Sequence, residues 1–104
     1  MMRKGRVYFN NVICGIIVED DEGYTFTYDE AYLNGDNQPV SLLLPLRRES
    51  YKSTVLFPFF DGLIPEGYLL DLAVKRWGYS YKDRFGLLLK TSNDSIGAVS
   101  VLEE

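Results

Sequence analysis

The first third of the chain follows the two-residue alternation of a half-buried β-sheet. Two apolar runs, Val7–Phe9 and Val12–Val18, are separated by Asn10-Asn11, and asparagine tolerates the left-handed backbone of a tight two-residue turn. Residues 24–28 alternate strictly between aromatic side chains and threonine. The pattern therefore predicts a hairpin followed by a third strand with three aromatic side chains on one face.

Two small residues interrupt the second run. Gly15 within a strand indicates a bulge or a close approach of another backbone. Cys14 is the only cysteine, so the chain has no internal disulfide, and we expect it to pack as a small buried hydrophobe.

The middle of the chain is less regular. Residues 29–35 predict a single helical turn that is capped by Asp29 and stopped by Gly35. The apolar segment Pro39–Pro45 predicts a short strand at a sheet edge, because proline donates no hydrogen bond to a neighbour. The basic segment Arg47–Ser53 predicts a solvated loop, and it is also a cluster that could engage an acidic partner surface.

From residue 54 the pattern becomes helical, with a corner at Phe59–Gly67. The preceding run, Val55–Phe60, contains Pro58 and predicts a short or irregular helix. Gly62 permits a turn, and we place Pro65 in the first turn of the next helix.

Two carboxylates occupy this corner. We expect Asp61 to accept hydrogen bonds from backbone N–H groups there, and Glu66 to lie in the first turn, where the helix dipole favours negative charge. The main alternative to this structural interpretation is an acid/base enzyme that uses Asp61 and Glu66, but two acids across a turn are a weak signal.

Two further helices and a strand are predicted beyond the corner. Apolar residues at helical spacing give the first helix a wide inward stripe, and Gly78 ends this helix. The second helix starts at Ser80–Asp83, which resembles a capping box. A last strand covers residues 96–102. The apolar positions are Leu69, Leu70, Leu72, Ala73, Val74 and Trp77 in the first helix and Phe85, Leu88 and Leu89 in the second. The fold class is therefore α+β, with a small, mostly antiparallel sheet and two to three helices in the C-terminal half.

Composition narrows the function. The 104 residues carry a net charge of −4, include 46% hydrophobic residues and contain no histidine. A single cysteine and no histidine exclude histidine-based zinc sites and Ser-His or Cys-His pairs, so we expect no metal and no cofactor. The acidic balance disfavours DNA binding by the chain itself, and no run reaches the ~20 apolar residues of a membrane span. The start lacks the apolar region of a signal peptide, which predicts a cytoplasmic protein.

Known nucleotide motifs do not fit either. Residues 62–67 have the glycine spacing of a phosphate-binding loop, but Tyr68-Leu69 stands where lysine and serine or threonine are required. The kinase catalytic loop needs a His-Arg-Asp sequence, which a chain without histidine lacks.

Four blocks in order carry a resemblance to a known family. These are the opening strand pair at Val7–Val18, Ser41–Leu46, Phe59–Gly67 and Asp94–Val99. Together they resemble the N-terminal subdomain of HipA-type serine/threonine kinases, the bacterial toxins of HipBA systems, over nearly the whole chain. The family pattern has a Ser-Leu-x-Leu-Pro-Leu segment, an FFDNLLPEG-like block and a D-x-x-G-A-V ending. Gly62 departs from it, because asparagine is common there.

The resemblance implies one domain over residues 1–104 without catalytic elements, which in the family lie downstream. Because the chain ends where the subdomain would end, it is also similar to HipS of three-gene HipBST systems, in which HipS restrains the kinase HipT and HipB handles DNA. The implied function is an antitoxin or regulatory module that binds a HipA/HipT-like kinase, with a HipB-like protein in the same complex. The alternative is the N-terminal scaffold of a longer HipA-like kinase.

Aromatic and arginine side chains dominate many protein interfaces, and the corner and its helix supply several. For Trp77, packing in the core is the alternative. The candidate partner-binding residues are Phe60, Asp61, Glu66, Tyr68, Arg76 and Trp77.

Overall fold

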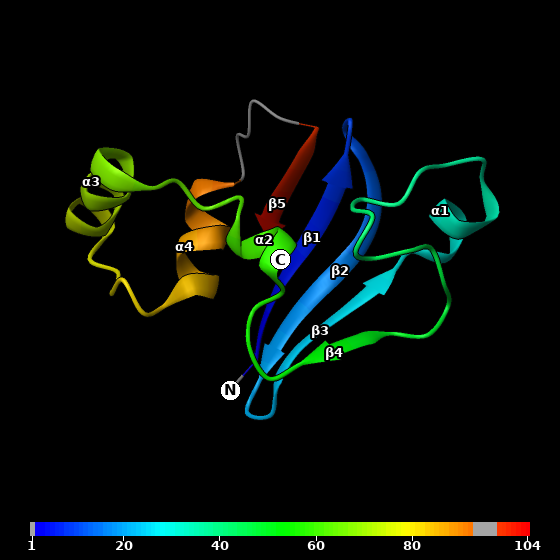
Figure 1. Ribbon diagram of the computed structural model, residues 1–104, viewed down its shortest axis with the longest axis horizontal. Helices are drawn as coiled ribbons and strands as arrows, with labels where there is room; N and C mark the ends of the chain where they lie inside the picture. The colour runs from blue at the N-terminus through cyan, green and yellow to red at the C-terminus, as the bar shows by residue number, and fades with distance from the viewer. Residues whose placement is uncertain (1, 93–97) are drawn as a thin grey trace.

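The computed structural model describes residues 2–92 and 98–104, which build a five-stranded antiparallel sheet with helices packed on it (Figure 1). The strand order is β4-β3-β2-β1-β5. The α+β prediction is confirmed, with three of the described helices in the C-terminal half. The elements are β1 (Arg3–Phe9), β2 (Val12–Asp20), β3 (Gly23–Tyr28), α1 (Glu30–Asn34), β4 (Tyr51–Ser53), α2 (Pro58–Asp61), α3 (Gly67–Trp77), α4 (Arg84–Thr91) and β5 (Val99–Glu103).

The predicted hairpin and its bulge are both present. Asn10 and Asn11 take positive φ angles of 51° and 68° between β1 and β2. Val7 lies opposite Gly15 but the next residue of β1 lies opposite Ile13, so Cys14 is the extra residue of a bulge. A Cβ on Gly15 would lie 2.6 Å from the Thr27 carbonyl oxygen, which explains the glycine as a close backbone approach.

The core lies between one face of the sheet and helices α2 and α4. As predicted, the aromatic side chains of β3 face this core; Phe26 is fully buried and its ring centroid lies 5.3 Å from that of Phe60. Cys14 is fully buried, and burial raises the pKa of its thiol to about 12, so it packs as a hydrophobe as expected. The predicted inward residues of α4, Phe85, Leu88 and Leu89, are buried as well.

An ion cluster that the sequence pattern did not indicate fastens α4 to the sheet. The Arg3 guanidinium donates to both carboxylate oxygens of Asp83, at 2.7 and 3.1 Å, and to Glu19 at 2.7 Å. Tyr24 donates to the other Glu19 oxygen. Asp83 is also the N-cap of α4 and accepts from the Gly86 N–H, so α4 begins here and not at the predicted box from Ser80.

The predicted edge strand at Pro39–Pro45 is wrong, because this segment forms turns. The Tyr28 side chain points from β3 into the core, where its hydroxyl accepts a hydrogen bond from the Val40 N–H and donates one to the Leu44 carbonyl. These two bonds satisfy backbone groups that would pair with an adjacent strand if the segment were in the sheet. The edge strand is instead β4, within the segment predicted as a solvated loop; Tyr51 pairs with Phe26 there.

The predicted cap and end of the first helix are confirmed, and the predicted last strand is present. Asp29 caps α1 by accepting from the Tyr32 N–H, and α1 ends before Gly35. The predicted last strand is present as β5, Val99–Glu103, and residues 96 and 97 of the predicted range lie outside the described part of the chain.

Candidate partner-binding site

The corner is anchored in the core by its aromatic side chains. Helix α2 begins at Pro58, whose fixed φ suits a first helical position, so the predicted short helix is confirmed. Phe60 has no exposed surface and packs against the rings of Phe57 and Phe59 at centroid distances of 6.2 and 5.2 Å. Phe60 therefore supports the corner from within, and any contribution to a partner surface would be indirect.

Asp61 holds the corner to α4. Its carboxylate accepts from the Arg84 Nε at 2.7 Å, and the two side chains are 42% and 31% exposed. The expected hydrogen bonds from backbone N–H groups to this carboxylate are wrong, because the corner N–H groups donate to backbone carbonyls, such as Gly62 to Pro58. An ion pair to the start of α4 therefore supplements the aromatic packing that anchors the corner.

The helix beyond the corner begins later than predicted. Its first residue is Gly67, so Pro65 precedes the helix and Glu66 occupies the N-cap position without a side-chain capping bond. The sequence-based prediction placed Pro65 and Glu66 in the first turn of the helix, and this is wrong for both residues. Glu66 is exposed at the surface next to the N-terminus of α3.

Only one side of α3 packs against the rest of the molecule. Ala73 is 5% exposed, and Leu70 and Val74 are partly buried against the core. Leu69 and Leu72, predicted to face inward, are 60% and 43% exposed. The apolar stripe is therefore wider than the surface available to cover it, and part of it remains in solvent.

The exposed part forms a coherent surface, here called the outer α3 face, which comprises Tyr68, Leu69, Leu72 and Arg76. These residues follow i, i+1, i+4 and i+8 spacing and so share one side of a helix. Tyr68 is 76% exposed, the highest value among the large hydrophobic side chains of α3. Trp77 lies beyond them at the C-terminal end and is 46% exposed, so neither full burial nor full exposure describes it.

The outer α3 face combines apolar side chains with positive charge at the C-terminal end of the helix. Lys75 and Arg76 lie in the last turn, where cations complement the helix dipole. The one acid of the helix, Asp71, accepts a hydrogen bond from the Tyr81 hydroxyl, which raises the pKa of Tyr81. Five of the six predicted residues therefore have exposed side chains on the corner and α3, and Phe60 is the exception: the five are Asp61, Glu66, Tyr68, Arg76 and Trp77.

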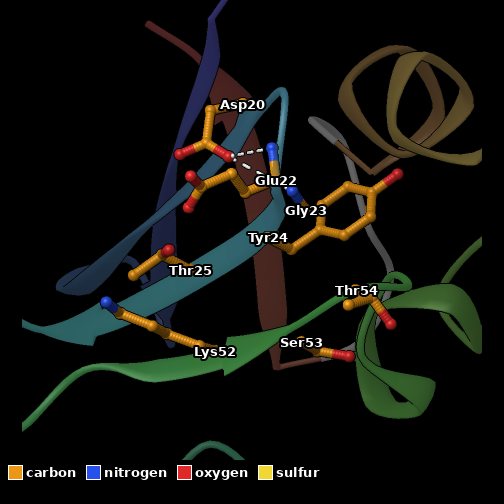
Figure 2. Close-up of a pocket in the computed structure, with 8 residues that line it drawn as sticks. All are labelled: Asp20, Glu22, Gly23, Tyr24, Thr25, Lys52, Ser53 and Thr54. Atoms are coloured by element: carbon orange, nitrogen blue, oxygen red, sulfur yellow. Dashed lines mark hydrogen bonds between the residues drawn. The ribbon is translucent and has the colours of Figure 1, made fainter.

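One hollow of the surface, of about 320 Å³, lies beside the turn between β2 and β3, outside the corner and α3. Figure 2 shows its lining: Asp20 accepts from the Glu22 and Gly23 N–H groups, and Lys52 lies on the neighbouring strand β4. The hollow contains none of the six predicted residues. Across the described residues, no three cysteine, aspartate or glutamate side chains are grouped to hold a metal ion. Within residues 2–92 and 98–104, no helix has both the length and the apolar character to cross a bilayer.

Comparison with known proteins gives consistent matches. The family model described as HipA N-terminal domain matches residues 5–102. An uncharacterised protein of Haemophilus influenzae is 32% identical over 104 residues, which cover all of this chain and 95% of that protein. Y4mE, a candidate kinase of Sinorhizobium fredii, is 34% identical over 100 residues, but these are only 24% of its length.

Two solved structures share the fold. One is described as the N-terminal domain of HipA toxin, with a TM-score of 0.76 and 27% identity over 98% of this chain and 92% of that chain. The other is the complex of HipA, HipB and operator DNA from the toxin–antitoxin system of Shewanella oneidensis MR-1. Its matched chain has a TM-score of 0.77 and 20% identity over 94% of this chain but 23% of its own length, a likeness of fold.

Proposed function

The chain belongs to the HipA N-terminal domain family, and from this premise we propose that it is a non-catalytic module that binds and restrains a HipA/HipT-like serine/threonine kinase. The setting is a toxin–antitoxin system in the bacterial cytoplasm, with a HipB-like DNA-binding protein in the same complex. Support comes from the related domain of a HipA toxin and from the presence of HipB and DNA in the complex of the Shewanella protein.

The observation that carries the proposal is the outer α3 face. Tyr68, Leu69 and Leu72 expose a large apolar surface on a helix that stands away from the sheet in Figure 1. Contiguous exposed apolar surface next to arginine is typical of protein interfaces, in which a few aromatic and arginine anchors provide most of the affinity. A standard interface buries about 800 Å² on each partner, and α3 with the corner forms its proposed centre.

The test is a titration of the purified chain into the kinase encoded beside it, followed by calorimetry and by kinase autophosphorylation. The Leu69→Ser/Leu72→Ser variant removes two apolar anchors from exposed positions, so it should fold normally and raise Kd by about tenfold or more. Val55→Ser is the matched control, because Val55 is 66% exposed but lies in the loop before α2. A wild-type chain that neither binds the kinase nor lowers its activity contradicts the proposal.

A second candidate is an N-terminal scaffold within a longer HipA-like kinase. It is favoured by the two longer proteins, in which the matching region is about a quarter of the length. In that case the outer α3 face would contact a lobe of the same polypeptide. Reading the gene beyond Glu104 separates the two candidates, because a kinase region in the same frame identifies the scaffold.

The acid/base enzyme remains the most distant alternative. One oxygen of the Asp61 carboxylate is already occupied by the hydrogen bond from the Arg84 Nε. A kinase-free sample of the Asp61→Asn/Glu66→Gln variant, compared with wild type for any hydrolytic activity, tests it. Activity that disappears in this variant would favour the enzyme over the binding module.

A further inference from the structure

A second exposed apolar feature lies far from α3. Residues Ser41–Leu44, here called the dileucine turn, form a β-turn in which the Leu44 N–H donates to the Ser41 carbonyl at 3.0 Å. Leu42 is 92% exposed, more than any other large hydrophobic side chain in the described part of the chain, and Leu43 is 72% exposed. The centre of a turn normally holds glycine, proline, asparagine, aspartate or serine, so turn formation does not explain two leucines.

The base of the dileucine turn is hydrogen-bonded to a core side chain. The Tyr28 hydroxyl accepts from the Val40 N–H at 3.1 Å and donates to the Leu44 carbonyl, so one core side chain closes the base of the turn. Val40 and Leu44 are only 7% and 4% exposed. The tip is therefore held in a defined position, and a pre-organised tip loses less conformational entropy when it binds.

Cationic side chains flank the turn. Arg47 stacks over the Tyr51 ring at 3.7 Å and donates to two backbone carbonyls, and no carboxylate of the described residues lies within ion-pair distance of it. Arg48 is 74% exposed, and its one ion pair among the described residues is with Glu30, at 3.8 Å and equally exposed. Three residues lie between Leu43 and Arg47, and the four steps of chain from one Cα to the other span at most about 14 Å. The surface is thus an apolar tip with a cationic border.

We propose that the dileucine turn inserts Leu42 and Leu43 into an apolar pocket with an acidic rim on the kinase, as a second anchor beside the outer α3 face. This inference rests on the proposed function. In Figure 1 the segment between α1 and β4, which contains the turn, lies on the other side of α2 from α3, so the two anchors are separate patches that contact separate parts of the partner.

Other occupants fit the observations less well. In a two-fold pair of this chain joined through the turn, Arg47 and Arg48 would approach their own copies, and like charges repel. A membrane surface would gain only two leucines, whereas even a single myristoyl chain gives marginal binding. A protein pocket satisfies both the apolar tip and the arginines.

The experiment compares the wild-type chain, Leu42→Ser/Leu43→Ser and Val55→Ser in titrations against the kinase. Because both leucines lie in solvent, the double variant should keep the circular dichroism spectrum and thermal transition of the wild type. We expect its Kd to rise by about tenfold or more. When the two double variants are combined, their fold-increases in Kd should multiply, as expected for distant, independent sites. Arg48→Glu should slow association and weaken its salt dependence.

Each outcome is decisive. Unchanged affinity in Leu42→Ser/Leu43→Ser, while the wild type binds and Leu69→Ser/Leu72→Ser does not, overturns the second anchor but leaves the proposed function intact. A wild-type chain that fails to bind the kinase overturns both. An unchanged Kd together with loss of self-association by light scattering, or loss of binding to phosphatidylserine vesicles, overturns the kinase pocket in favour of a second copy or a membrane surface.

Discussion

Replacing Asp83 tests whether one side chain both starts α4 and fastens it to the sheet. Its carboxylate receives two hydrogen bonds from Arg3 and one from the Gly86 N–H, with the side chains of Asp83 and Arg3 29% and 30% exposed. Losing a helix cap costs about 1 kcal/mol, and losing a partly solvated, charge-assisted pair about 1–2 kcal/mol more. Asp83→Ala should therefore lower the free energy of unfolding by about 2–3 kcal/mol, which corresponds to about 10–20 °C in Tm for a domain of this size.

Asp83→Asn separates the two contributions, because the amide oxygen can still cap Gly86 but has no charge for Arg3. We expect a loss of about 1–1.5 kcal/mol near neutral pH. The hydrogen bond from Arg3 lowers the pKa of Asp83 below its ordinary value. A lowered folded-state pKa gives stability that is present above the unfolded pKa of about 3.9 and is lost as the pH falls through the folded value. The gap between wild type and Asp83→Asn should therefore narrow below about pH 4.

Urea titrations followed by circular dichroism between about pH 3 and 7 measure both effects. The matched control is Asp36→Asn, an exposed aspartate in the segment after α1, which should change stability by less than about 0.5 kcal/mol. If Asp83→Asn were as stable as wild type at pH 7, or if the gap between them stayed constant down to pH 3, the assignment of Asp83 as the fastening residue would be refuted.

Two further predictions concern the bulge of β2. Gly15→Ala should destabilise the protein by about 1–3 kcal/mol in a urea titration, because its Cβ would lie 2.6 Å from the Thr27 carbonyl oxygen. Gly62→Ala, at φ −68° and 3.3 Å from the nearest atom, should change stability far less, and equal effects of the two would contradict the close approach. Cys14 is buried with a thiol pKa raised to about 12, so a thiol reagent at pH 8 should label native protein at least about a hundredfold more slowly than protein in urea. Similar labelling rates would mean that the bulge is open to solvent.

The sequence by itself determined the features that depend on near neighbours. The Asn10-Asn11 turn, the alternation of residues 24–28 and the cap at Asp29 all involve residues a few positions apart, so local pattern was sufficient to predict them. The order of strands and helices followed from the same signals, although the fourth strand was placed about ten residues too early.

Only the tertiary structure decided which surfaces are covered. Arg84 meets Asp61 across 23 residues and Arg3 meets Asp83 across 80, and no local pattern indicates pairs so far apart. Helix α3 is apolar on more than one side, so its periodicity showed that it is amphipathic but not that Leu72 would stay in solvent. Burial depends on which neighbour arrives, and that neighbour is set by the packing of the whole chain, so the candidate binding surfaces at α3 and at Leu42 emerge only in three dimensions.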